Sequence, residues 1–181
     1  MHHARRLRRR GSVTTMWVAS LPVFMIFFMF LGSMVIAWMQ HGVAQKAADA
    51  GGLAATKKLD EVTGQQLQAQ ISQLAGNTFN PVEAIIGTPE LKHLFIKGVI
   101  RSNEEAIKKE VRKYVEKNGA KPSKIIFFED GRVVVEAKIK YQPMIFQDQF
   151  KEVYVKGEGF GPVRDYGKWW QQEKNPYIIE F

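Results

Sequence analysis

Residues 16–39 read MWVASLPVFMIFFMFLGSMVIAWM and form the longest apolar run in the chain. As an α-helix this run would be about 36 Å long, which is enough to cross a hydrocarbon core of about 30 Å. A cleaved secretory signal has an apolar region of only about 7–15 residues. The pattern therefore predicts one uncleaved transmembrane helix, with Trp17 and Trp38 near the two membrane surfaces.

Helical spacing continues beyond this segment, to residue 76. Apolar residues recur there every three or four positions, beginning with Val43, Ala47, Ala50 and Ala54. The weak points of this long helix, where a kink or break would be easiest, are Pro22, Gly51-Gly52 and Gly64. Ala44, Ala48 and Gly52 have the small-xxx-small spacing that lets membrane helices approach closely. Residues 40–76 are thus predicted to form a juxtamembrane helix, whose small residues either pack on neighbouring helices or simply favour helix formation.

Two shorter helices are expected after a linker at residues 77–87. Thr88 has the character of an N-cap and Pro89 suits the first helical position, which predicts a helix over residues 89–100. Ser102 and Glu105 have capping-box spacing at the start of a second helix. Asn118-Gly119 should end that helix.

The hydrophobic period then changes from that of a helix to that of a strand. Residues 124–129 and 132–141 are predicted strands, joined by the hairpin turn Asp130-Gly131. The second strand alternates so that one face should be buried and the other mostly wet. Residues 150–160 supply a third antiparallel strand, which leads into a turn or bulge at Gly157, Gly159 and Gly161. The predicted fold class is α+β: two helices packed on a three-stranded sheet, placed after the membrane helix.

The C-terminal tail is unusually apolar, with Trp169-Trp170 followed by YIIEF at residues 177–181. It either packs back on the domain, where it could add a strand, or forms a surface that binds a partner or a membrane.

Charge is distributed unevenly along the chain. The formal net charge is +8, and five of the positive charges are Arg5, Arg6, Arg8, Arg9 and Arg10. Residues 77–181 carry 18 basic and 15 acidic side chains, so the chain is not basic throughout. Arginines next to a membrane span remain on the cytoplasmic side, which predicts a cytoplasmic leader over residues 1–15 and an extracytoplasmic domain over residues 77–181. Since the arginines adjoin an apolar segment and have no interleaved aromatic residues, nucleic-acid binding is not expected.

Recognisable catalytic chemistry is missing from the sequence. There is no cysteine, and the four histidines lack metal-ligand spacing. The glycines near residue 159 have neither the strand-to-helix context nor the lysine of a phosphate loop. We therefore expect a protein that is not an enzyme and has no cofactor or metal.

Three features occur in order over residues 10–56: a basic leader ending in Gly11-Ser12, an apolar run with an early Leu21-Pro22, and QKAADAGGLAA at residues 45–55. Together they resemble the TadE/TadG-like proteins, which are pseudopilin-like components of the Tad (Flp) pilus. The resemblance implies a minor or accessory subunit of a pilus or secretion apparatus in the cell membrane. It also implies other pilins or pseudopilins and pilus-assembly proteins as partners, and homo- or hetero-oligomers.

The resemblance further implies cleavage of the Gly11–Ser12 bond by a prepilin peptidase. One residue departs from the pattern, because the TadE branch usually has Glu where this chain has Met16. In this respect the chain resembles the TadG-like branch, and retention of the leader is the alternative. A signal-anchored extracytoplasmic module that binds cell-wall or extracellular ligands is the alternative function.

Overall fold

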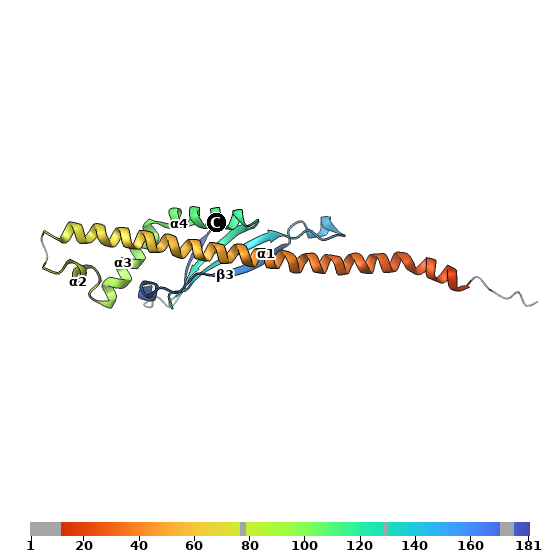
Figure 1. Cartoon of the computed structure of the whole chain (residues 1–181), viewed down its shortest axis with the longest axis horizontal. Coiled ribbons are helices and arrows are strands. Elements are labelled where there is room, and N and C mark those ends of the chain that lie inside the picture. Colours follow the sequence, from red (N-terminus) through yellow and green to blue (C-terminus); the bar gives the residue numbers. More distant parts are fainter. Residues whose placement is uncertain (1–11, 77–78, 129, 171–175) are drawn as a thin grey trace, which may run out of the picture.

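The computed structural model describes residues 12–76, 79–128, 130–170 and 176–181. Its dominant element is α1 (Ser12–Leu74), a single helix of 63 residues. Figure 1 shows that the N-terminal part of α1 projects alone, whereas its C-terminal part runs along a folded domain. The predicted transmembrane and juxtamembrane helices are therefore one continuous element.

The expected weak points in α1 do not interrupt it. Pro22, Gly51-Gly52 and Gly64 all lie inside the helix. A glycine costs a helix only about 1 kcal/mol relative to alanine, and Gly51 and Gly52 are buried in contacts that can offset this cost. The helix therefore runs on past these weak points, as the predicted extension into a juxtamembrane helix requires.

Three helices follow: α2 (Pro81–Ile86), α3 (Pro89–Ser102) and α4 (Glu104–Lys117). The short α2 occupies part of the predicted linker. The predicted start of α3 is confirmed, because the Thr88 hydroxyl accepts a hydrogen bond from the Leu91 amide. The capping box was wrong: Ser102 ends α3, where its hydroxyl donates to the Gly98 carbonyl, and Asn103 is the N-cap of α4.

Four strands form one antiparallel sheet in the order β3-β2-β1-β4. They are β1 (Lys121–Phe127), β2 (Val133–Lys140), β3 (Tyr154–Phe160) and β4 (Tyr177–Glu180). Short 3-10 turns, η1 (Gln147–Phe150) and η2 (Asp165–Trp170), flank β3. The predicted α+β class is confirmed, but the sheet has a fourth strand, because the apolar tail returns to pair with β1.

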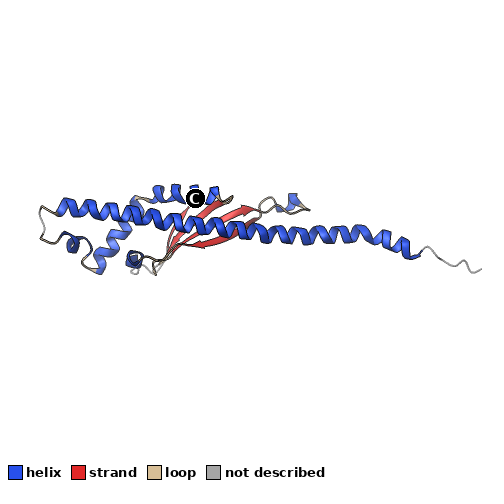
Figure 2. Ribbon diagram, in the orientation of Figure 1, coloured by secondary structure: helices blue, strands red, loops and turns tan. Residues whose placement is uncertain are grey.

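The hydrophobic core lies between the helices and one face of the sheet. It joins Ala47, Ala55 and Leu59 of α1 to Ile96 of α3, Val111 of α4 and Val135 of β2. Figure 2 shows the four strands alongside the middle of α1, so that the helix serves as the spine of the domain. The face of β2 that was predicted to be mostly solvent-exposed is exposed only in part, because Val134 and Glu136 on that face are also buried.

Candidate functional site

The N-terminal half of α1 is apolar and exposed. Trp17 is 68% exposed, Phe28 65% and Trp38 78%. Among the residues that the structure describes, α1 is the one helix long and apolar enough to cross a membrane, and only 6% of its most apolar window is buried. This apolar window is therefore not packed inside the domain, unlike the second half of α1. An exposed apolar surface of this extent points to contact with lipid or with other apolar helices.

The small residues of α1 lie against strand β3 of the same chain. Ala44 and Ala48 are 0% exposed and Gly52 is buried. Gly157 of β3 lies next to Ala44, and Gly159 lies next to Ala48. Each is so close that a Cβ on the strand glycine would overlap the helix backbone. The stripe that was predicted to contact neighbouring helices is thus occupied within the chain.

Helix and strand periods match along this contact. Gly161, two residues after Gly159, lies against Gly52, four residues after Ala48. Four residues of α-helix rise about 6 Å and two residues of strand rise about 6.6 Å, so the two sets stay in register. We call the six residues Ala44, Ala48, Gly52, Gly157, Gly159 and Gly161 the glycine seat. The sequence predicts a turn or bulge at Gly157, Gly159 and Gly161, but Gly157 and Gly159 lie within β3 and allow close approach of the helix backbone.

Polar side chains of α1 hold the backbone of β3 beside the glycine seat. The Gln45 side chain donates to the Glu158 carbonyl through Nε2 and accepts from the Glu158 amide through Oε1. One turn earlier, His41 Nδ1 lies 2.8 Å from the Lys156 carbonyl oxygen. Because β3 is an edge strand, these bonds satisfy backbone groups that would otherwise be free to pair with another chain.

A second polar contact ties the segment after β3 to α1. Arg164 binds the Asp60 carboxylate through Nε at 3.1 Å and a terminal nitrogen at 2.9 Å. The Tyr166 hydroxyl donates a hydrogen bond to the same carboxylate. Burial of the ring, together with the bond to Asp60, raises the pKa of Tyr166. This cluster holds the chain on α1 where the glycine seat ends.

On the outer face of the sheet, a buried carboxylate lies between two lysines. Glu136 of β2 is 4% exposed, and its oxygens lie 2.9 Å from Lys124 Nζ and 2.8 Å from Lys156 Nζ. Burial opposes ionisation, but hydrogen bonds from Lys156 and Lys124 outweigh it and lower the pKa of Glu136. The ion pairs connect the three strands β1, β2 and β3.

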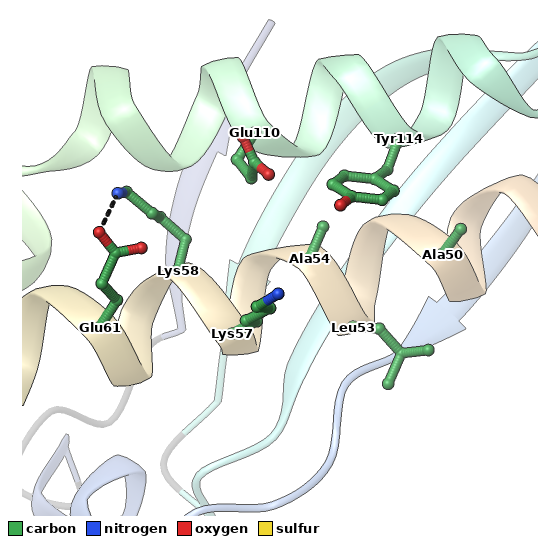
Figure 3. A pocket seen from close by; sticks show the side chains of 8 residues that line it. All are labelled: Ala50, Leu53, Ala54, Lys57, Lys58, Glu61, Glu110 and Tyr114. Atoms are coloured by element: carbon green, nitrogen blue, oxygen red, sulfur yellow. Dashed lines mark hydrogen bonds and ion pairs between the residues drawn. The ribbon is translucent and has the colours of Figure 1, made fainter.

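A groove of about 350 Å³ lies between α1 and α4, beside their contact in the core. Figure 3 shows Ala50 and Ala54 on its α1 wall, opposite Glu110 and Tyr114 of α4, with Lys58 bound to Glu61 at one end. The small alanines leave this space between the helices. Its charged lining residues are Lys57, Lys58, Glu61 and Glu110, and Lys58 is already paired with Glu61.

The loop between β2 and β3 contacts α1 inside the predicted transmembrane segment. The Tyr141 hydroxyl donates to the Ser33 carbonyl at 2.9 Å. The Ser33 hydroxyl accepts from the Met144 amide at 3.0 Å and donates to the Met29 carbonyl at 2.9 Å. The Met144 sulfur lies over Gly32, where a Cβ would meet it at 2.5 Å. Gly32 and Ser33 therefore join the apolar half of α1 to the β2–β3 loop.

Some predicted site residues lie outside the described part of the chain. These are the five arginines of the leader, Arg5, Arg6, Arg8, Arg9 and Arg10, and Gly11 on one side of the proposed cleavage site. Ser12, on the other side, is the first residue of α1.

No protein-family model, curated protein or solved structure matches this chain.

Proposed function

We propose that this protein is a pseudopilin-like subunit of a Tad/Flp-type pilus or secretion apparatus, and that it acts by assembly rather than by catalysis. The observation that carries the proposal is α1: one unbroken helix is exposed and apolar over its first half and is the spine of an α+β domain over its second half. A subunit that must be held in a bilayer while it presents a folded domain outside needs these two parts. The TadE/TadG-like features of residues 10–56 supply the specific family.

In this proposal the membrane orientation follows from charge. The five arginines of the leader stay in the cytoplasm, and α1 carries the domain to the other side. The orientation can be tested by adding protease to intact cells and following the C-terminus. We expect digestion of the outer domain without permeabilisation. Digestion only after the membrane is opened would contradict the orientation.

Contacts with other subunits are assigned to the exposed half of α1, because the glycine seat is already filled. In lipid such contacts form through close van der Waals packing rather than through a hydrophobic driving force. Side chains available for them include Met25 and Phe28, which are 54% and 65% exposed.

Because the chain has no cysteine, a single Met25→Cys or Phe28→Cys variant carries a unique thiol for crosslinking in cells. We expect crosslinks to pilin or pseudopilin subunits, and loss or shortening of surface filaments when the gene is deleted. Leu94→Cys is the matched control, since Leu94 is 63% exposed on α3 of the outer domain. Unchanged filaments together with crosslinks to no pilus component would overturn the proposal and favour a signal-anchored binding module.

Cleavage after Gly11 is part of the same proposal, with the intact leader as its alternative. Mass spectrometry of the membrane-extracted protein distinguishes them, since the mature chain would begin at Ser12.

A further inference from the structure

The β2–β3 loop lies at an unusual depth along α1. Ser33, which bonds Tyr141 and Met144, is about 8 Å beyond the midpoint of residues 16–39 along the helix axis. A hydrocarbon core of about 30 Å centred on that midpoint would extend about 7 Å past Ser33. If the core instead covers residues 13–33, Ser33 lies at its edge. In both placements the loop reaches the boundary of the bilayer.

The surface of the loop is apolar where it reaches this boundary. Met144 is 55% exposed and Phe146 is 62% exposed. Residues 141–147 read YQPMIFQ and carry no charge, whereas the charged residues Asp148, Lys151 and Glu152 come later in the loop. Figure 1 shows this loop, in light blue, as the part of the domain that extends furthest toward the N-terminal end of α1. Its exposed apolar surface thus adjoins that of the helix.

The loop is built to keep its shape. Tyr141 packs edge-on against Phe150 with ring centroids 5.5 Å apart. Pro143 is buried, and Phe146 has a left-handed backbone with φ of 60°. A left-handed conformation costs a residue other than glycine on the order of 1 kcal/mol or more, and such strain persists where the surrounding structure imposes it. Here the residue with the strained backbone is a phenylalanine whose apolar side chain is exposed, and exposure of that side chain to water is unfavourable.

We propose that residues 141–150 form a second membrane contact, in which Met144 and Phe146 enter the lipid at the boundary between headgroups and acyl chains. The occupant is the outer leaflet of the bilayer that α1 spans, and the inference therefore rests on the membrane anchoring proposed above. With two contacts, α1 and the loop, the outer domain has a defined tilt and a defined side facing the membrane.

The test uses the full-length protein in phosphatidylcholine vesicles, with single cysteines labelled by an environment-sensitive fluorophore. Phe146→Cys and Met144→Cys report on the loop, Ile26→Cys on the middle of the span and Leu94→Cys on the outer domain. We expect blue-shifted emission at 146 and 144 that is quenched by nitroxides placed shallowly in the lipid. Deep nitroxides should quench residue 26, and neither set should quench residue 94.

The outcomes separate this inference from the anchoring on which it depends. If deep nitroxides quench the fluorophore at residue 26, while the fluorophores at residues 146 and 144 behave like the one at residue 94, the membrane anchor stands and the loop inference is overturned. If residue 26 is not quenched by lipid nitroxides, the anchoring itself fails and the loop inference with it. A blue shift at 146 that no lipid nitroxide quenches and that grows with protein density would assign the loop to a neighbouring subunit, which also overturns the lipid contact.

Discussion

Gly159 lies so close to Ala48 that a Cβ on the glycine would overlap the Ala48 carbonyl carbon and the Asp49 amide nitrogen. Two backbones therefore meet directly, with no side chain from the strand between them. Such a contact has little room to relax, because backbone atoms on both sides are fixed by the helix and by the sheet.

Gly159→Ala should destabilise the outer domain by about 1–3 kcal/mol, the usual cost of overpacking a filled contact. The free energy of unfolding in urea, measured on the full chain in detergent micelles, checks this. Gly64→Ala is the control, because Gly64 lies in α1, the helix that Gly159 contacts, and has open space around it. That change should instead stabilise the helix by up to about 1 kcal/mol. Equal effects at the two positions would contradict the glycine seat.

The added fourth strand predicts unequal effects at two neighbouring isoleucines. Ile179 of β4 is 1% exposed and belongs to the core, whereas Ile178 is 48% exposed on the outer face. Ile179→Ala should lower the free energy of unfolding by about 2–5 kcal/mol, and Ile178→Ala should lower it by less than about 1 kcal/mol. Thermal unfolding of both variants measures the difference. Similar small losses would show that the tail does not pair with β1.

Asp60 and Tyr166 should be energetically coupled. Tyr166→Phe removes a half-buried hydroxyl that bonds a carboxylate, and it should cost about 1–2 kcal/mol. In an Asp60→Asn background, Tyr166→Phe should lower the free energy of unfolding by a smaller amount. The difference between the two losses, which a double-mutant cycle measures, should exceed about 0.5 kcal/mol. Lys168→Met is the control, since its partner Asp165 has a side chain that is 97% exposed and the change should have little effect. Additive effects of the two substitutions on the free energy of unfolding would show that Tyr166 and Asp60 are not energetically coupled.

Glu136 should make stability depend on acid pH. Its pKa is lowered in the folded protein, so its contribution is complete above the ordinary value of 4.5 and is lost as pH falls through the lower folded value. Glu136→Gln should therefore be less stable than wild type near neutral pH, and the two unfolding curves should converge in acid. Glu158→Gln is the control: Glu158 is exposed and lies beside Glu136 in the sheet, so its loss should lower stability at neutral pH by less than Glu136→Gln does. A constant difference between Glu136→Gln and wild type at all pH values would refute this role.

Local signals predicted much of this fold. The uncharged run and its helical continuation gave α1, Thr88-Pro89 gave the start of α3, and Asp130-Gly131 gave the hairpin, where Gly131 has φ of 83°. These features depend on a few adjacent residues, and the structure contains them. The start of α4 was misplaced by a single residue, because the Ser102 hydroxyl bonds back to the Gly98 carbonyl of α3 and Asn103 precedes α4 without a side-chain cap.

The glycine seat could not be derived in the same way. Ala44, Ala48 and Gly52 show a helical small-residue spacing, but the same spacing serves a contact with another helix or with a strand. The matching signal was the alternation of Gly157, Gly159 and Gly161, which are more than 100 residues away in the sequence. Comparing a four-residue period in a helix with a two-residue period in a strand would have connected the two sets. The contact of Ser33 with Met144 has no such pattern, and only the fold reveals it.

Because α1 has no break, the number of residues in its apolar half determines the azimuth of the outer domain. Each residue turns an α-helix by about 100° and advances it by about 1.5 Å. Removing one residue before Gly32 would leave the contacts at Ser33 intact, yet it would rotate the sheet about 100° around the membrane normal relative to the side chains embedded further down. In the assembly proposed above, neighbouring copies would then present a different flank to one another, although no residue of the domain had changed.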